Sequence, residues 1–384
     1  MSNPGQHGPV PAHLEKLASE YAENPHTAAM KWFRNAGLGL FLHYGLYALH
    51  GKGEWGMYNQ AMDLGEYEKL AERFTAEKFD ADFITDLACQ AEAKYVNFTT
   101  KHHDGFCLWD SDNCAFNSAN SAAGRDLVGE MAGQCRAKGL GFFLYYSYAL
   151  DWHHPWFFSL DYFDRARPPY DHPEPHYLFR KAEDFRRYID DVHAQLTELL
   201  TNYGPVAGVW FDPEMAYHAQ KDLFPLSETY ALIRKLQPHA LVAFKHGATG
   251  EEDFAAPEGR GLPLLEKIRD RIGEKEAEEA QRAWDAHKDK RGEICDTLSF
   301  SWGYHEKNDE NHIGPDEVMS KLAEAWRRDC NLLINTGPLP SGAIPEPDVK
   351  TLREVGRRIR SGEIPGAADG DAFGSTLPPS APIT

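Results

Sequence analysis

Several short apolar runs of this 384-residue sequence end in side chains that could carry chemistry. The segment 94–111, KYVNFTTKHHDGFCLWDS, passes from β-branched residues directly into His102, His103 and an aspartate. Other runs end in the same manner, in His43, in Tyr145 with Tyr146, and in Trp210 with Asp212. An acid beside an indole is typical of a sugar site, because the aromatic body of the indole supplies an apolar face with one polar handle.

The spacing within VWFD decides which of these side chains can act together. Residues i and i+2 of a strand point to the same side, so Trp210 and Asp212 share a face while Phe211 packs outward. A histidine at one strand end is more often a core or capping residue, and an aspartate after a strand often caps a helix. Recurrence at four strand ends favours a functional site.

A metal centre is the competing interpretation of the histidine pairs at 102–103 and 153–154. Adjacent residues at a strand exit are expected to diverge, and the sequence contains neither H-x-H nor H-E-x-x-H. We therefore predict no catalytic metal. A serine nucleophile is not indicated either, because no G-x-S-x-G motif occurs.

The elements that position these residues alternate between short apolar runs and longer amphipathic patterns. The predicted strands are Leu38–Tyr44, Tyr95–Thr100, Gly141–Ser147, Ala207–Asp212, Ala240–Lys245, Thr297–Ser301 and Leu332–Asn335. The predicted helices are Ala81–Ala93, Leu127–Lys138, Ala182–Asn202, Leu226–Leu236 and Pro315–Asp329.

This alternation predicts an α/β fold, a TIM-like (β/α) barrel of regular or irregular form. A dinucleotide-binding fold is not indicated, because no G-x-G-x-x-G turn follows a strand and GLGLF at 37–41 lies within one. In such a barrel the carboxyl ends of the strands and their loops meet at one mouth. The reactive side chains are therefore expected to converge there.

Composition limits the partners. The sequence has 40 basic and 59 acidic residues and a net charge of -19, which disfavours nucleic acid and anionic membranes. The six cysteines form no C-x-x-C pair and are predicted to be separate buried thiols. The N-terminus has no basic region followed by an apolar run, which predicts a cytoplasmic protein without a membrane span.

Three regions are expected along the chain: an N-terminal helical extension at 1–30, a catalytic barrel at 31–360 and a flexible tail at 361–384. The segment 262–290 is a highly charged helical stretch whose apolar positions Leu264, Leu265, Ile268 and Ile272 share one face. Only its first half is predicted to pack. A solvated helix is favoured for the rest over an excursion near the barrel mouth.

Six segments together resemble one known family. They are WFRNAGLGLFLHYGLYALHGKGEW at 32–55, KYVNFTTKHHDGFCLWDS at 94–111, RDLVGEMAGQCRAKGLGFFLYYSYALDWHHP at 125–155, VAGVWFDPE at 206–214, SWGY at 301–304 and NLLINTGPLPSG at 331–342. Their order and content resemble the retaining α-L-fucosidases of glycoside hydrolase family 29. The resemblance covers most of residues 31–360.

The resemblance implies a role for each matching position. Asp212 would be the nucleophile, and EDFAAPEG at 252–259 would supply Glu258 as acid/base, with Glu293 as the alternative. The residues implied to bind the sugar are His43, Glu54, Trp55, His102, His103, Tyr145, Trp210, Lys245 and Trp302. No cofactor is implied. The implied partner is a fucosylated oligosaccharide or glycoside, and homo-oligomerisation is left open.

Three departures from the family pattern stand out. Lys245 replaces a frequent arginine and offers a point charge instead of a bidentate contact, and Tyr44 replaces the tryptophan of H-W-G. The sequence also ends too early for the C-terminal β-sandwich of many members. We expect Asp212 to be held anionic and the pKa of Glu258 to be raised.

A catalytically silent carbohydrate-binding barrel and a metal-dependent hydrolase remain the alternatives to a fucosidase.

Overall fold

The computed structural model of the protein describes residues 8–259, 264–307 and 311–363. Its strands are β1 Leu38–Leu42, β2 Tyr95–Lys101, β3 Gly141–Ser147, β4 Gly208–Asp212, β5 Leu241–Phe244, β6 Phe254–Ala255, β7 Gly292–Thr297 and β8 Cys330–Thr336. Its α-helices are α1 Ala18–Glu23, α2 Pro25–Arg34, α3 Leu46–His50, α4 Gly56–Asn59, α5 Leu64–Glu68, α6 Ala81–Gln90, α7 Leu127–Ala137, α8 Phe185–Thr201, α9 Glu214–Ala219, α10 Leu226–Leu236, α11 Leu265–Arg271, α12 Glu274–Asp285, α13 Pro315–Arg327 and α14 Glu346–Arg360. The 3₁₀ helices are Ala12–Leu17, Lys69–Arg73, Ala182–Asp184 and Lys221–Leu223.

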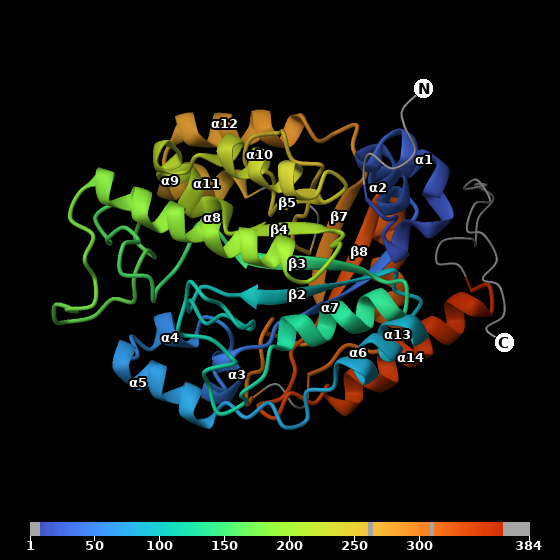
Figure 1. The fold of residues 1–384 in the computed structure, drawn as a ribbon, viewed down its shortest axis with the longest axis horizontal. Coiled ribbons are helices and arrows are strands. Elements are labelled where there is room, and N and C mark those ends of the chain that lie inside the picture. Colours follow the sequence, from blue (N-terminus) through green and yellow to red (C-terminus); the bar gives the residue numbers. More distant parts are fainter. Residues whose placement is uncertain (1–7, 260–263, 308–310, 364–384) are drawn as a thin grey trace.

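The eight strands form one parallel sheet in the order β6-β5-β4-β3-β2-β1-β8-β7. The ends of this sheet meet at a seam, where Glu258 bridges to Cys295 of β7 and the Gly259 N–H donates to the carbonyl of Cys295 at 2.9 Å. The predicted (β/α) barrel is therefore confirmed. In Figure 1 the arrowheads of β2 and β3 point away from α1 and α2, so the mouth lies at the end opposite the N-terminal helices.

Two details of the predicted strands are wrong. The strand expected at Thr297–Ser301 is β7, Gly292–Thr297, and residues 298–301 lie beyond its end. The sequence of β7, GEICDT, contains two acids, so it lacks the apolar signal that reveals the other strands. Strand β6 was not predicted, because two paired residues are too few to make a pattern.

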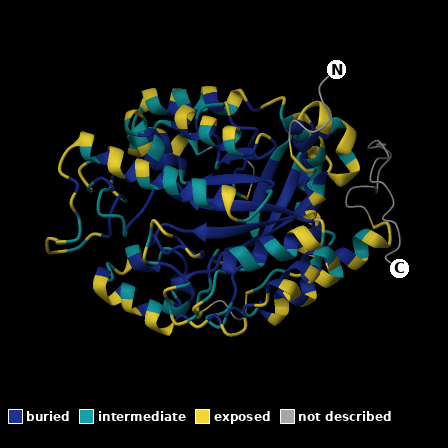
Figure 2. Ribbon diagram, viewed as in Figure 1, coloured by how far each residue is buried: buried dark blue, intermediate teal, exposed yellow. Residues whose placement is uncertain are grey.

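Alternation along the strands separates two cores. In β4, Val209 and Phe211 face the surrounding helices, whereas Trp210 faces the barrel interior. In β3, Tyr146 faces the helices and Tyr145 the interior, which repeats the same rule. The predicted division between Trp210 and Phe211 is confirmed. Figure 2 shows the strands mostly buried, with the exposed residues on helices and loops.

The N-terminal helices cover the end of the barrel away from the mouth. Their buried residues Leu14, Ala29 and Phe33 belong to the same apolar cluster as the interior residues Tyr95 and Phe143. Figure 1 shows α1 and α2 against this end of the strands. The bottom of the barrel is therefore sealed by apolar packing.

The charged segment at 262–290 forms two helices, α11 and α12, and its first two residues lie outside the described ranges. Ile268 of α11 is buried, as its periodicity suggests. The expectation that only the first half packs is wrong, because Ala277, Ala280 and Ala283 of α12 are also buried. Alanines placed on one helical face allow close packing without a conspicuous apolar stripe.

Of the expected flexible tail, residues 364–384 lie outside the described ranges, and α14 ends just before them. All six cysteines are free thiols, but the prediction that they are buried is correct only for Cys107, Cys135 and Cys295, because the other three are partly exposed. No helix in the described part of the chain is long and apolar enough to cross a bilayer.

Candidate functional site

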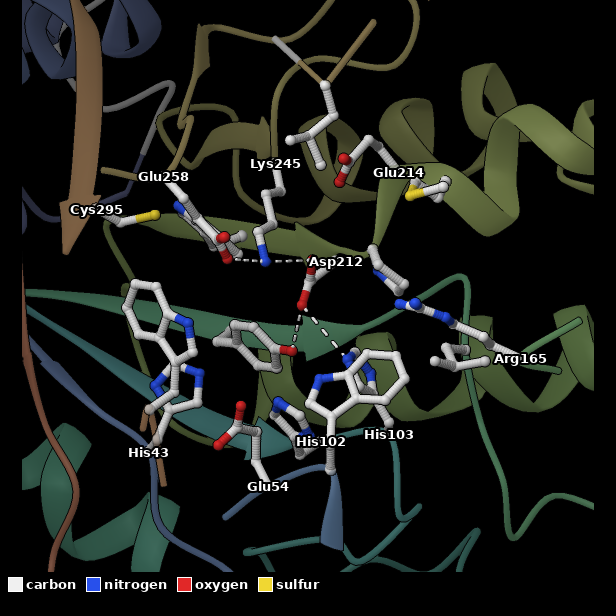
Figure 3. Close-up of a pocket in the computed structure, with 18 of the residues that line it drawn as sticks. His43, Glu54, His102, His103, Arg165, Asp212, Glu214, Lys245, Glu258 and Cys295 are labelled. Carbon is white, nitrogen blue, oxygen red and sulfur yellow. Dashed lines mark hydrogen bonds and ion pairs between the residues drawn. The ribbon is translucent and has the colours of Figure 1, made fainter. Parts of the chain in front are cut away.

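A cavity of about 340 Å³ opens at the carboxyl ends of the strands. It is lined by all eleven residues that the sequence predicts for the site, namely His43, Glu54, Trp55, His102, His103, Tyr145, Trp210, Asp212, Lys245, Glu258 and Trp302. Figure 3 shows those of them that it labels directed toward one another. Residues separated by more than two hundred positions in sequence therefore share one cavity.

Lys245 lies between the two predicted catalytic carboxylates. Its Nζ is 3.3 Å from Oδ1 of Asp212 and 2.5 Å from Oε1 of Glu258 (Figure 3). Because one ammonium contacts both oxygens, these oxygens lie within about 6 Å of each other, which includes the ~5–5.5 Å carboxyl separation of retaining glycosidases. The arrangement comes from neighbouring elements: β4 ends at Asp212, Lys245 follows β5, and Glu258 lies at the seam.

Asp212 is fixed by further contacts on its second oxygen. The hydroxyl of Tyr145 donates to Oδ2 at 2.7 Å, and Nε2 of His103 lies 3.6 Å from the same oxygen. Asp212 is 3% exposed. The carboxylate is therefore held in one orientation at the end of β4.

Glu293 occupies a different layer of the barrel. Its carboxylate accepts hydrogen bonds from the hydroxyl of Tyr95 and, at 2.9 Å, from Nε1 of Trp210. Burial raises its pKa to about 7. Glu293 does not line the cavity. Of the two acid/base candidates, only Glu258 can contact a group bound there.

Hydrogen-bond partners fix the orientation of two of the three histidine rings that line the cavity. Nδ1 of His43 lies 2.8 Å from Oδ1 of Asn335, and Nδ1 of His103 lies 2.6 Å from the hydroxyl of Ser147. His102 stacks on Tyr145 with 5.3 Å between ring centroids and 3° between planes. Burial is the main cause that lowers the pKa of His43 to about 3 and those of His102 and His103 well below 6.5. All three are neutral at neutral pH.

The adjacent histidines converge, contrary to the expectation that they would diverge. Ligand atoms of His102, His103 and Asp212 all lie within 4.8 Å of one another. The reason is local: β2 ends at Lys101 and the chain then turns, with the Gly105 N–H donating to the carbonyl of His102 at 3.1 Å. Strand alternation no longer applies beyond Lys101. The three groups could hold a cation as well as a sugar hydroxyl.

Glu54 accepts hydrogen bonds from the loop that carries Trp302. Its Oε2 accepts from the hydroxyl of Ser301 at 3.1 Å and from the Gly303 N–H at 2.9 Å. Trp302 lies beside His43, with 5.2 Å between ring centroids. Burial raises the pKa of Glu54. Positions distant in sequence are thus locked into one aromatic and polar wall.

The pKa directions of the candidate pair differ from the sequence expectation. Burial raises the pKa of Asp212, and the charge of Lys245 only partly opposes this. Burial also acts to raise the pKa of Glu258, but the close contact with Lys245 outweighs it and the pKa is lowered. The expected raised pKa of Glu258 is therefore wrong for this arrangement, because Lys245 contacts both acids.

Several cavity residues escaped the sequence analysis. Glu214 follows Asp212 in the DPE of VWFDPE and could have been found from that motif. Arg165 comes from an irregular stretch between β3 and α8, where no periodicity exists to indicate it. Lys267 and Arg271 belong to the charged helix α11, where a run of charges conceals any individual role.

A parallel barrel whose mouth brings two carboxylates together among aromatic rings and imidazoles is the architecture of the barrel glycoside hydrolases. Comparison with known proteins identifies the family. The family model described as alpha-L-fucosidase matches residues 11–361, so the chain belongs to the α-L-fucosidase family. The resemblance inferred from the motifs is confirmed.

Individual proteins similar to this chain are also named α-L-fucosidases. The structure of alpha-L-fucosidase isoenzyme 1 from Paenibacillus thiaminolyticus is 33% identical, with a TM-score of 0.72 over 92% of this chain and 80% of that one. A GH29 alpha-L-fucosidase from Bacteroides thetaiotaomicron, trapped as a covalent intermediate in complex with 2-fluoro-fucosyl fluoride, is 25% identical, with a TM-score of 0.69 over 88% of this chain and 76% of that one. Alpha-L-fucosidase 1 of Arabidopsis thaliana is 26% identical over 86% of this chain. The chain spans 59% of the length of this plant relative.

Proposed function

We propose that this protein is a retaining exo-α-L-fucosidase that hydrolyses terminal α-L-fucosyl linkages by double displacement. The observation that carries the proposal is the contact of one ammonium, Lys245, with both Asp212 and Glu258 inside the cavity. The relative trapped as a covalent intermediate adds support for a glycosyl-enzyme route. We also propose that residues 31–360 are the catalytic unit, with 1–30 as its extension and 361–384 as its tail.

In the first displacement, Asp212 attacks the anomeric carbon and Glu258 protonates the leaving oxygen. The bond from the anomeric carbon to the aglycone oxygen breaks as the bond to the Asp212 carboxylate forms. Tyr145 and His103 hold the attacking carboxylate in one orientation, which reduces the entropic cost of the step. No cofactor is needed for this chemistry.

In the second displacement, Glu258 accepts a proton from water as the water attacks the same carbon. Two inversions then release fucose with its anomeric configuration retained. Glu258 must therefore alternate between the protonated and the ionised form. Its place at the seam beside Lys245 suits this alternation, because a small change in the position of the ammonium changes the pKa of the carboxyl.

The pKa of Asp212 is raised and that of Glu258 is lowered, so substrate binding must change the protonation state of both groups. A leaving-group oxygen that contacts Glu258 takes the place of Lys245 at that carboxylate. Lys245 then interacts with Asp212 alone, which favours the ionised nucleophile, while Glu258 loses its counter-ion and takes up a proton. Binding of the correct glycoside thereby sets both protonation states.

The remaining side chains bind the sugar. The neutral imidazoles of His43, His102 and His103 can each donate to one hydroxyl and accept from another. Trp302 supplies an apolar face for the methyl group at C6 of fucose. Loss of any of these groups is expected to weaken binding and turnover together.

The decisive experiment replaces the proposed nucleophile and follows the anomer that is released. The Asp212→Gly variant is expected to lose turnover of 4-nitrophenyl α-L-fucoside and to recover part of it with azide as an external nucleophile. Proton NMR of the wild-type reaction should show α-L-fucose as the first product. Near-native activity of the variant, or first release of the β-anomer, would contradict the assignment.

The convergence of His102, His103 and Asp212 favours one second candidate, a metal-dependent hydrolase. In that case a divalent cation would activate water, and a chelator would abolish turnover. The fucosidase mechanism predicts that extended treatment with a chelator leaves the rate unchanged. Binding of fucose without turnover of any activated fucoside would instead indicate a silent carbohydrate-binding barrel.

A further inference from the structure

The outer part of the cavity is lined by three cationic side chains: Arg165, Lys267 and Arg271. Arg165 precedes α8 on the long segment after β3, and the other two lie on α11. Lys267 and Arg271 are exposed and Arg165 is partly buried, whereas the sugar-binding histidines and Asp212 are buried. Three cations gathered at one opening are unexpected in a chain of net charge -19.

The acids deeper in the cavity have partners of their own. Asp212 and Glu258 share Lys245, and Oε1 of Glu214 lies 3.0 Å from Nδ1 of His246. The three cations Arg165, Lys267 and Arg271, here called the rim cations, therefore do not compensate those acids through direct contact. Another explanation is needed for their position.

The rim cations have few carboxylate partners of their own. Within residues 8–259, 264–307 and 311–363, no carboxylate forms an ion pair with Arg165 or Lys267. Arg271 lies 3.6 Å from Asp164, but their side chains are 40% and 63% exposed, and such pairs contribute little. The guanidinium of Arg165 instead lies over the ring of Trp55, with Cζ 5.4 Å from the centroid. Figure 3 shows Arg165 directed toward the centre of the cavity.

We propose that the outer part of the cavity is an aglycone subsite in which Arg165, Lys267 and Arg271 select leaving groups that carry an oxyanion, either a carboxylate or a sulfo group. The proposal rests on the proposed function, because fucose at Asp212 directs its aglycone toward the opening. A guanidinium presents paired N–H donors that match two oxygens of such a group, and Trp55 offers an apolar surface beside them. The bond that is cleaved is unchanged, so the rim determines only which aglycone is accepted.

The test uses three nitrophenyl α-L-fucosides that differ at one ring position, where they carry a carboxamide, a carboxylate or a sulfonate. The measured quantity is kcat/KM for each anionic substrate divided by kcat/KM for the carboxamide. Comparison of this ratio between protein variants cancels the intrinsic difference in leaving-group reactivity. The carboxylate and sulfonate ratios separate the two forms of the anion.

The variant to compare with the wild type is Arg165→Gln combined with Arg271→Gln. We expect its ratio to fall by roughly fivefold or more for at least one anion, because charge complementarity acts on the anionic substrate only. Raising the salt concentration should lower the wild-type ratio toward that of the variant. Lys267→Gln, on the exposed surface of α11, gives a second measurement if the double variant does not fold.

Arg269→Gln is the matched control. Arg269 lies on the same helix and carries the same charge, but it pairs with Glu274 at 2.7 Å and does not line the cavity. Its ratio should equal that of the wild type. Equal ratios for all of these proteins would overturn the anionic subsite and leave fucoside hydrolysis standing. Failure to hydrolyse any of the three substrates would overturn the proposed function, and the subsite with it.

Discussion

The two ends of the barrel use the same kinds of side chain for different purposes. Strand β8 carries a buried asparagine at each end. At the bottom, Asn331 accepts from the Gly37 N–H at 2.9 Å and donates to the carbonyl of Phe33 at 2.8 Å. At the mouth, Asn335 contacts Nδ1 of His43 and donates to the carbonyl of Trp302 at 2.8 Å. The first asparagine holds backbone, whereas the second orients groups that face a cavity.

Two acids near the seam show the same contrast. Glu293 accepts from Trp210 and Tyr95 within the packed interior, whereas Glu258 contacts a cation and lines the cavity. Both are carboxylates near the same seam. What distinguishes a chemical group from a structural one here is access to the cavity, and neither burial nor a perturbed pKa is sufficient by itself.

The largest effect is expected from a comparison of these two glutamates. Glu258→Ala should lower kcat/KM for an unactivated fucosyl disaccharide by about 10²–10⁴-fold, because the leaving oxygen loses its proton donor. The loss should be much smaller for 4-nitrophenyl α-L-fucoside, whose leaving group needs little protonation. Glu293→Gln should retain most of the activity on both substrates. A large loss in Glu293→Gln together with little loss in Glu258→Ala would reverse the assignment.

The next prediction concerns the cation that joins the two acids. Lys245 lowers the pKa of both Asp212 and Glu258, so Lys245→Gln should raise both values. The nucleophile must be ionised, and the acidic limb of the kcat/KM profile should therefore move to higher pH. Activity should fall most on the acidic side of the wild-type optimum.

A pH profile with 4-nitrophenyl α-L-fucoside measures this shift. Lys69→Gln is the control, because Lys69 pairs with Glu66 on an exposed surface and does not line the cavity. An unshifted acidic limb in Lys245→Gln would mean that the lysine does not influence the titration of the nucleophile.

The two asparagines of β8 provide the third comparison. Asn335→Ala leaves His43 and the carbonyl of Trp302 without a buried partner, which costs about 1–3 kcal/mol, and we expect this cost to appear in fucose binding. Asn331→Ala should cost a similar free energy of unfolding and leave KM unchanged. Inhibition by fucose and denaturant unfolding of both variants separate these outcomes. Equal effects on KM would remove the distinction between the two ends.

The sequence predicted the parts of the fold that repeat. Apolar runs such as VWFD and FFLYYS have the strand period, so the barrel, its mouth and the inward direction of Trp210 and Asp212 could be inferred. The motif resemblance supplied Glu54 and Trp302, which no periodicity would have brought together.

What the sequence could not predict depends on contacts between distant segments. The shared position of Lys245 arises only when β4, β5 and the seam are assembled, and it lowers the pKa of Glu258, which was expected to be raised. The convergence of His102 and His103 depends on a turn after β2. Arg165 lies on an irregular segment whose course is set by tertiary contacts. Two-residue β6 is defined only by its neighbours.

The smallest effect is expected at the bottom of the barrel. Among the described residues, Nε2 of His13 is buried without a hydrogen-bond partner, and its ring packs on Trp32 with 4.7 Å between centroids. Burial, with repulsion from His239, lowers the pKa of His13 from 6.5 to about 3. As the pH falls, the unfolded chain therefore binds a proton at His13 at a higher pH than the folded protein does. The stability that depends on neutral His13 is complete above about pH 6.5 and is lost progressively below it.

At about pH 5 this single group should cost roughly 2 kcal/mol of the free energy of unfolding. His13→Phe keeps the packing on Trp32 and removes the titrating group, so urea unfolding should depend less on pH between about 6.5 and 4 than in the wild type. Turnover of the fucoside at neutral pH should not change, because the bottom of the barrel does not contact the cavity. An identical pH dependence in both proteins would mean that His13 becomes solvated before the barrel opens, and that the bottom of the barrel is not sealed against water.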